Sequence, residues 1–374
     1  MKASYVALVV LVLMIGGFLI ALARNGAVES ADEPVSATDI VPRGYVCYRA
    51  SSPIVIDGTL DDLAWADAPW SESFRDIQGD LRPDPLLRTR MKMLWDENAL
   101  YIAAELEEPH VWGTITQHDA VIFQDNDFEV FINPDGDGHN YGEFEMNALN
   151  ATWDLLLTKP YKDGGKAVDS WEIKGLKTGA HVDGTINDPR DVDRGWTVEI
   201  ALPWKSLKEV SYCPVPPRDG DQWRINFSRV EWDVDIVNDK YVKVPMRPEH
   251  NWVWSPQGEI DMHRPERWGI VQFSGAKPGT AEFHPDPAQP ARDYLHRIYY
   301  AQRAIHKQHH AFVTSLAALN LGPLPAGLSN PALEATRNTF EASVDLRRPG
   351  GVREQWRITH DARFTKVGSP ADAK

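Results

Sequence analysis

The chain has 374 residues, of which 43% are hydrophobic, 10% aromatic and 25% charged, a composition typical of folded globular proteins. Because 54 acidic residues outnumber 39 basic ones, the net charge is −15, which excludes a protein-wide attraction to nucleic acid. Two cysteines, Cys47 and Cys213, exclude a cysteine-built zinc or iron–sulfur cluster. Their spacing leaves a disulfide open, and we expect two free, buried thiols.

The N-terminus carries an export signal. An uncharged, mostly apolar run spans residues 3–23, between Lys2 and Arg24. Its length fits a membrane-spanning helix, whereas Ala21-Leu22-Ala23 offers a cleavage site, so residues 1–24 are either a signal peptide or an anchor. The small, acidic and proline-containing segment 25–42 predicts a flexible tether. We therefore expect an exported protein of the bacterial periplasm or cell surface, secreted or attached to the membrane through residues 3–23.

Residues 43–275 alternate between apolar and polar side chains, which is typical of half-buried strands. Turn-rich stretches such as NPDGDGHNYG and PPRDGDQ separate these runs. The pattern predicts a mainly β protein with an antiparallel β-sandwich rather than βαβ units. The expected strands are residues 90–95, 100–107, 127–133, 143–147, 153–157, 196–202, 223–230 and 269–273.

The character of the sequence changes after Phe273. Residues 276–290 form a proline-rich linker. Apolar residues at helical spacing then predict a helix or helix pair over Ala291 to Leu319, ended by Gly322-Pro323. A hairpin is expected around Pro349-Gly350-Gly351. Residues 291–374 are thus expected to form a small α+β appendage, and its helix is a candidate contact for another protein.

Common catalytic motifs are absent from the sequence. HExxH, GxSxG, GxxxxGK[ST] and GxGxxG do not occur, so zinc peptidase, serine hydrolase, P-loop and dinucleotide functions lack their starting residues. The turn at Asp135 and Asp137 places oxygen ligands at alternate positions, but Phe144 stands where an EF-hand has its bidentate glutamate. A calcium site at Asp135 and Asp137 is therefore possible beside the alternative of a solvated turn, and no cofactor is required.

Polar and aromatic residues are concentrated in the segment 120–154. Strand alternation places Asp127, Glu129 and Phe131 on one face. On the following strand it places Glu143, Glu145 and Asn147 on one face, opposite to Phe144 and Met146. Sugar recognition needs this mixture, because hydroxyls require fixed hydrogen-bonding groups and the C–H face of a sugar ring requires an aromatic platform. An ordinary solvated sheet face explains the pattern equally well.

Eight blocks occur in order that resemble the carbohydrate-binding module family 9 domain, a DOMON-like β-sandwich. They are IDGTLDDLAWADAPW, MKMLWDENALYIAAELEEP, QDNDFEVFINPDGD, YGEFEMNALNATWD, GWTVEIALPWKSL, DQWRINFSRVEW, NWVWSP and ERWGIVQF. The resemblance covers roughly residues 45–273. It implies an immunoglobulin-like jelly-roll sandwich that binds oligosaccharide or polysaccharide without catalysis of its own and, in some members, holds structural calcium.

The same resemblance implies a set of sugar-binding residues. The family's acidic ligand falls on Glu129, its amide ligand on Asn147, and its second tryptophan on Trp254, with Trp252 two residues before it. The first tryptophan of the family falls near Phe123, which can still stack on a sugar. The arginine of the family falls on Glu145, which reverses the charge at that position.

The first hypothesis is thus a non-catalytic, exported carbohydrate-binding protein of polysaccharide breakdown. A second is a haem-binding, DOMON-like electron-transfer module, for which Met93, Met146 and His110 are available as ligands although no spacing selects them. A third is a glycoside hydrolase that uses paired carboxylates such as Glu129 and Glu145.

Overall fold

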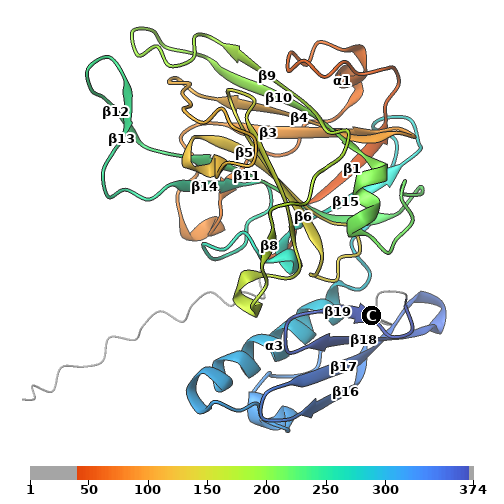
Figure 1. Ribbon diagram of the computed structural model, residues 1–374. Helices are drawn as coiled ribbons and strands as arrows, with labels where there is room; N and C mark the ends of the chain where they lie inside the picture. The colour runs from red at the N-terminus through yellow and green to blue at the C-terminus, as the bar shows by residue number, and fades with distance from the viewer. Residues whose placement is uncertain (1–39, 370–374) are drawn as a thin grey trace, which may run out of the picture. The chain divides into compact units, whose positions relative to one another are not determined.

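The structure, a computed structural model, describes residues 40–369 (Figure 1). The expected apolar segment 3–23 lies outside the described residues, as does almost all of the tether 25–42. Within the described part of the chain, no helix combines the length and the apolar character needed to cross a membrane.

One large sheet forms most of the protein, and it curls so that its two halves face each other (Figure 1). Its main path runs in the order β8-β7-β6-β5-β11-β15-β1-β3-β4-β10-β9, and β14 and β2 branch from β11. The strands are β1 (Gly44–Arg49), β2 (Arg75–Asp76), β3 (Thr89–Trp95), β4 (Ala99–Glu107), β5 (Asp127–Asn133), β6 (Tyr141–Asn147), β7 (Thr152–Leu157), β8 (Ala167–Val168), β9 (Lys177–Asp183), β10 (Gly195–Pro203), β11 (Gln222–Glu231), β14 (His250–Val253) and β15 (Gly269–Ser274).

The eight strands expected from alternation all lie inside observed strands, which confirms the mainly β sandwich. One difference concerns β1, which pairs in parallel with both β15 and β3. These strands are more than forty residues apart in the sequence, so their pairing cannot be predicted from a local turn motif.

The main core fills the space between the two halves of the curled sheet. It contains the inward faces of β5, β6, β10 and β11, with Phe128, Phe144, Trp196 and Trp223 among its buried residues. Short elements cover the edges of the sandwich: helices α1 (Leu63–Asp67) and α2 (Trp204–Leu207), the separate ribbon of β12 (Val234–Ile236) and β13 (Tyr241–Lys243), and the 3-10 turns η1 (Gly79–Leu81), η2 (Ile122–Gln124), η3 (Tyr161–Asp163), η4 (Lys208–Val210) and η5 (Pro265–Arg267).

The C-terminal region is a helix packed on a second sheet. Helix α3 (Gln289–His309) lies against β17 (Phe340–Arg347) and β18 (Arg353–Thr359), and their apolar faces form a separate core. The hairpin expected around Pro349 is confirmed, and β16 (Leu328–Ala335) and β19 (Phe364–Lys366) extend it to four strands. The helix is shorter than predicted, because His310 adopts a left-handed conformation (φ 54°) that ends it. The 3-10 turn η6 (Leu316–Leu319) lies in the remainder of the segment expected to be helical. The 3-10 turn η7 (Pro349–Gly351) forms the turn of the hairpin.

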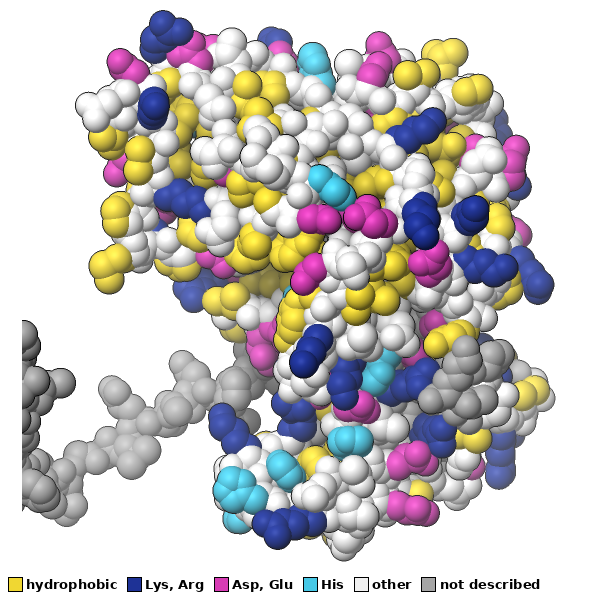
Figure 2. Space-filling view, in the orientation of Figure 1, with side chains coloured by type: hydrophobic (Ala, Val, Ile, Leu, Met, Phe, Trp, Pro, Cys, Tyr) yellow, Lys and Arg dark blue, Asp and Glu magenta, His cyan; other side chains and the backbone are white. Residues whose placement is uncertain are grey.

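Buried polar contacts join this region to the sandwich. The Asp163 carboxylate accepts hydrogen bonds from the Tyr299 hydroxyl (2.6 Å) and the Arg303 guanidinium (2.6 Å). Arg292 donates to the carbonyl of Gly136 at 2.7 Å. On the face shown in Figure 2, histidine and basic side chains gather on this region.

Both cysteines are free thiols. Cys47 is buried in the main core, as expected, but the expectation of a buried Cys213 is wrong. Cys213 is exposed, because it lies in the surface loop between β10 and β11. Its backbone N–H donates to the Asp135 carboxylate.

Candidate functional site

A pocket of about 330 Å³ lies on the face of β5, β6 and β7 that points away from the main core. Glu129 and Phe131 of β5 contribute to its floor, as do Glu143 and Glu145 of β6. Pairing sets this arrangement, since Glu129 is opposite Glu145 and Phe131 is opposite Glu143. The face predicted from alternation is therefore confirmed, and the residues between these positions, such as Phe128 and Phe144, fill the core on the other side.

The floor of the pocket is acidic and deeply buried. Glu129, Glu143 and Glu145 of the floor are respectively 5%, 6% and 2% exposed, and Asp127, on the same face of β5 but outside the pocket lining, is 0% exposed. No lysine or arginine lines the pocket to neutralise them. Burying a carboxylate without a cation disfavours its charged form, so these groups either hold protons or bind a positively charged partner.

The acidities of the four groups follow from this burial. Burial, with a smaller contribution from Glu249, raises the pKa of Glu129 to about 7, and the neighbouring Ser228 hydroxyl offsets part of this rise. Burial and the neighbouring Glu129 carboxylate raise the pKa values of Asp127, Glu143 and Glu145 well above their usual range. The pocket floor thus holds carboxyl groups that can both donate and accept hydrogen bonds near neutral pH.

Two carboxyl oxygens of this acidic cluster, one of them on the pocket lining, have no partner. Asp127 Oδ1 accepts the Val230 N–H at 3.2 Å and Glu145 Oε2 accepts the Phe123 N–H at 3.0 Å. Asp127 Oδ2 and Glu143 Oε2 have no hydrogen-bond partner. One oxygen from each of Asp127, Glu129 and Glu145 lies within 4.8 Å of the others, which is close enough for an oxygen-liganded cation such as Ca²⁺, with bonds of about 2.3–2.6 Å.

Aromatic side chains form the walls of the pocket. Phe123 lines it from η2, at the position where the resemblance placed a stacking residue. Trp153 of β7 and Tyr161 of η3 also line it, and the sequence analysis missed both as site residues. Trp153 pairs with Glu145 in the sheet, so strand alternation together with the register would have identified it. No local signal marks Tyr161, because its loop reaches the pocket only through the tertiary fold.

Asn147 lies beside this site but its side chain is used elsewhere. Its Nδ2 donates to the Ile115 carbonyl at 2.9 Å and to Asp125 at 3.0 Å. Its Oδ1 accepts the N–H groups of Leu149 and Ala151. The amide therefore holds the β6–β7 turn and the preceding loop, and Asn147 does not line the pocket.

The two tryptophans assigned by the resemblance lie in the main core. Trp254 is 0% exposed and packs against Tyr45 and Phe227. Trp252 is 6% exposed, and its ring lies between the Arg229 guanidinium (5.1 Å) and the His250 ring (5.7 Å). Neither residue lines the pocket, so neither offers a free aromatic face to a sugar.

The acidic turn proposed for calcium makes protein contacts instead. The Asp135 carboxylate accepts the backbone N–H groups of Tyr212 (2.9 Å) and Cys213 (2.8 Å). Asp137 accepts the His139 N–H at 2.8 Å and pairs with Arg363 at 3.2 Å. The two side chains thus brace the turn against other segments and are not among the convergent groups found in the described residues.

The residues considered for haem are also engaged. Met93 and Met146 are 0% exposed and belong to the main core. The His110 ring lies 3.2 Å from the Tyr241 hydroxyl. Their positions therefore give no support to a haem site.

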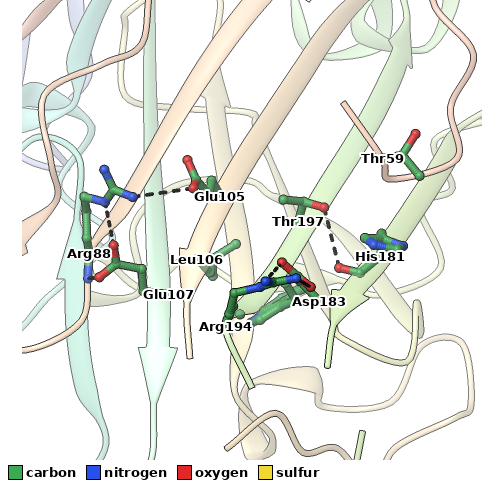
Figure 3. Close-up of a pocket in the computed structure, with 11 residues that line it drawn as sticks. Thr59, Arg88, Glu105, Leu106, Glu107, His181, Asp183, Arg194 and Thr197 are labelled. Carbon is green, nitrogen blue, oxygen red and sulfur yellow. Dashed lines mark hydrogen bonds and ion pairs between the residues drawn. The ribbon is translucent and has the colours of Figure 1, made fainter. Parts of the chain in front are cut away.

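A second, larger hollow of about 580 Å³ lies over β4, β9 and β10 (Figure 3). Its charged groups already pair with one another: Arg88 with Glu105 and Glu107, and Arg194 with Asp183. These pairs are largely exposed, so a ligand would compete with both water and internal partners. The acidic pocket on β5–β7 is the better candidate site, because its buried carboxyl groups have no cationic partner in the pocket lining and Glu143 Oε2 has no hydrogen-bond partner.

Comparisons with known proteins agree with this architecture. A family model described as "Carbohydrate family 9 binding domain-like" matches residues 56–274. Among curated proteins, endo-1,4-beta-xylanase A of Thermotoga maritima is 24% identical over 154 residues, which are 41% of this chain and 12% of the xylanase. The match thus spans a small part of that enzyme.

Solved structures of similar proteins include a carbohydrate binding module family 9 domain from Caldicellulosiruptor kristjanssonii in complex with cellotriose, at 16% identity and a TM-score of 0.41, covering 64% of this chain and 98% of that one. A putative carbohydrate-binding protein from Bacteroides uniformis has 16% identity and a TM-score of 0.46, covering 63% of this chain and 100% of that one. The family model covers more than half of the 374 residues. The chain therefore belongs to the carbohydrate family 9 binding domain-like proteins.

Proposed function

We propose that the acidic pocket on β5–β7 binds a sugar ring of an oligosaccharide or polysaccharide. The observation that carries the proposal is the combination, in one pocket, of the buried carboxyl groups of Glu129, Glu143 and Glu145 with aromatic side chains on its walls. The aromatic side chains are Phe123, Trp153 and Tyr161, and Glu143 Oε2 has no hydrogen-bond partner. The carboxyl groups suit sugar hydroxyls, and the aromatic rings suit the C–H face of a sugar. Membership of the family supports the same function.

The pocket floor carries Glu145 at the position where the family resemblance implies an arginine. A guanidinium only donates hydrogen bonds, whereas Glu145 accepts them when ionised and also donates when protonated. We therefore expect the protein to prefer ligands whose groups at this position are hydroxyl donors, and not carboxylated sugars, which the acidic floor would repel.

We further propose that the protein acts without catalysis, outside the cytoplasm, in the breakdown of polysaccharides. The apolar segment 3–23 supports export. A retaining glycosidase needs one ionised and one protonated carboxyl group, about 5–5.5 Å apart. Burial raises the pKa of Glu129 to about 7 and that of Glu145 well above its usual range. The proposal of a non-catalytic role therefore rests on the family and on the absence of common catalytic motifs from the sequence.

Titration calorimetry with neutral gluco-, xylo- and manno-oligosaccharides tests this proposal. We expect binding that Phe123→Ala and Trp153→Ala each weaken at least several-fold, since each removes a wall of the pocket. Trp70→Ala is the matched control, because Trp70 is a half-buried tryptophan that stacks under Arg90 (4.1 Å) and does not line the pocket. Equal affinity for all variants, or no binding to any glycan, would contradict the proposal.

A further inference from the structure

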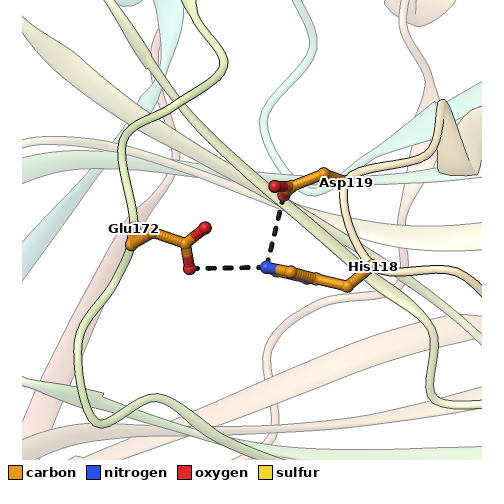
Figure 4. Close-up of side chains that lie close together, drawn as sticks. All are labelled: His118, Asp119 and Glu172. Carbon is orange, nitrogen blue, oxygen red and sulfur yellow. Dashed lines mark hydrogen bonds and ion pairs between the residues drawn. The ribbon is translucent and has the colours of Figure 1, made fainter.

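Four titratable side chains converge on the side of β7 opposite the acidic pocket. His118 and Asp119 lie in the loop that leads to η2, Asp154 lies in β7, and Glu172 lies in the loop after β8. His118 Nε2 is 3.3 Å from Asp119 Oδ1, 3.4 Å from Glu172 Oε2 and 3.8 Å from Asp154 Oδ1. Figure 4 shows the imidazole pointing between the carboxylates of Asp119 and Glu172.

The spacing of three of these side chains is suited to one small metal ion, and Asp154 lies next to them. The ligand atoms of His118, Asp119 and Glu172 all lie within 4.8 Å of one another. In a tetrahedral site with bonds of about 2.0–2.2 Å, neighbouring ligand atoms are about 3.3–3.6 Å apart. Two of the three distances from His118 Nε2 fall at or within this range, and the third, to Asp154, exceeds it by only a few tenths of an ångström.

Asp154 supplies an independent observation that points to a ligand. Its side chain is 1% exposed, and its Oδ1, the oxygen nearest to His118, has no hydrogen-bond partner. Its other oxygen accepts the backbone N–H of Ile173. A buried, unpartnered carboxylate oxygen is costly unless something compensates its charge.

The histidine is held in the orientation of a metal ligand. His118 Nδ1 lies 3.1 Å from the Thr152 carbonyl oxygen and 3.0 Å from its hydroxyl. Donation from Nδ1 to the carbonyl leaves the lone pair of Nε2 directed at the three carboxylates. Histidines that bind metals are commonly fixed in this way through their second nitrogen.

We propose that His118, Asp119, Asp154 and Glu172 bind one divalent transition-metal ion of the zinc class. One imidazole nitrogen with three carboxylate oxygens suits Zn²⁺ better than the all-oxygen sites of Ca²⁺. His118, Asp119 and Glu172 supply three converging ligand atoms, and Asp154 Oδ1, 3.8 Å from His118 Nε2, is the buried oxygen that would complete a closed, structural site. The ion would link the loop of Asp119, strand β7 and the loop of Glu172. These segments already share a backbone hydrogen bond from Asp119 N–H to the Thr152 carbonyl (3.0 Å) and one from Ile173 N–H to the Asp154 carboxylate.

This link would also stabilise one side of the sugar pocket. Phe123 follows Asp119 by four residues, and Trp153 precedes Asp154 on the opposite face of β7. Both residues line the pocket. The metal site is nevertheless a separate feature, so its test does not depend on finding the glycan.

The test is calorimetric titration of the full chain with ZnCl₂ after treatment with EDTA, combined with thermal unfolding. We expect one Zn²⁺ per chain and a melting temperature raised by several degrees. His118→Gln and Glu172→Gln should each weaken binding at least tenfold. Both side chains are about half exposed, at 48% and 50%, so these variants should still fold.

His250→Gln is the matched control. His250 is 44% exposed and lies 3.2 Å from a single carboxylate, that of Asp233, without further convergent groups. It should bind Zn²⁺ as the unaltered chain does. Binding that His118→Gln leaves unchanged would overturn the proposal, as it would assign the ion to surface histidines such as His309.

The position of the ion provides a second measurement. Anomalous diffraction at the zinc edge should place one peak between His118 and Asp154. A peak elsewhere, the absence of Zn²⁺ binding, or tighter binding of Ca²⁺ than of Zn²⁺ would each contradict the assignment.

Discussion

Replacing Glu129 by glutamine should make the protein less sensitive to rising pH. Burial raises the pKa of Glu129 from 4.5 to about 7 in the folded protein. Between these two values the folded chain binds more protons than the unfolded chain, so the free energy of unfolding falls as the pH rises. Glutamine is neutral throughout, and the variant does not share this loss.

The magnitude follows from the same values. At about 1.4 kcal/mol for each pKa unit, a rise from 4.5 to about 7 corresponds to about 3 kcal/mol. We therefore expect the stability difference between Glu129→Gln and the unaltered chain to increase by about 3 kcal/mol from pH 4.5 to pH 8. Loss of the Glu129 charge also favours ionisation of Glu145 and Asp127, which acts in the same direction.

Urea unfolding followed by tryptophan fluorescence, at several pH values and with EDTA present, measures this difference. Glu334→Gln is the control, because Glu334 is an exposed strand residue outside the acidic cluster. A difference for Glu129→Gln that stays constant within about 1 kcal/mol, or that shrinks as the pH rises, would show that Glu129 is not held in a poorly solvated, acidic cluster.

Three further predictions concern stability. Trp254→Ala should lower the free energy of unfolding by about 3–5 kcal/mol, because it leaves a cavity in the main core. Trp153→Ala, on the pocket wall, should lower it by about 1 kcal/mol. Equal losses in urea unfolding would contradict the assignment of Trp254 to the core and Trp153 to the pocket. Glu199→Gln should cost about 1.5–3 kcal/mol, because the buried carboxylate accepts two backbone N–H groups and an indole N–H, and thermal unfolding measures the loss. Tyr299→Phe should also lower the free energy of unfolding by about 1.5–3 kcal/mol, because it removes the 2.6 Å hydrogen bond to Asp163. Backbone hydrogen exchange in α3 should become faster. Unchanged exchange would show that this bond does not hold the helix to the sandwich.

Much of the fold could be predicted from the sequence because it depends on local pattern. The alternation in residues 127–133 and 143–147 predicted which side chains share a face, whereas the pairing of Glu129 with Glu145 came from the register of the sheet. The ordered motifs determined the family. The helical periodicity after Ala291 predicted α3 but not its end. The left-handed residue that ends the helix is His310, and not the glycine that usually marks such a position in a sequence.

The positions of the aromatic residues were decided by the tertiary structure. Alternation indicates which residues share a face, but not which face of a strand meets the second half of the sheet. Trp252 and Trp254 were expected beside the sugar, yet they belong to the main core, while Trp153 and Tyr161 line the pocket. Both faces of this curled sheet are largely covered, so burial does not separate a core tryptophan from a pocket tryptophan in the sequence.

The convergence of distant side chains also required the fold. His118 and Asp119 are adjacent in the chain, but Asp154 and Glu172 reach them only because β7 and the loop after β8 lie beside the loop that precedes η2. The sequence by itself determined the strands, their faces and the family. Only the tertiary structure decided which polar atoms are buried without partners, because that depends on contacts between segments that no local pattern relates.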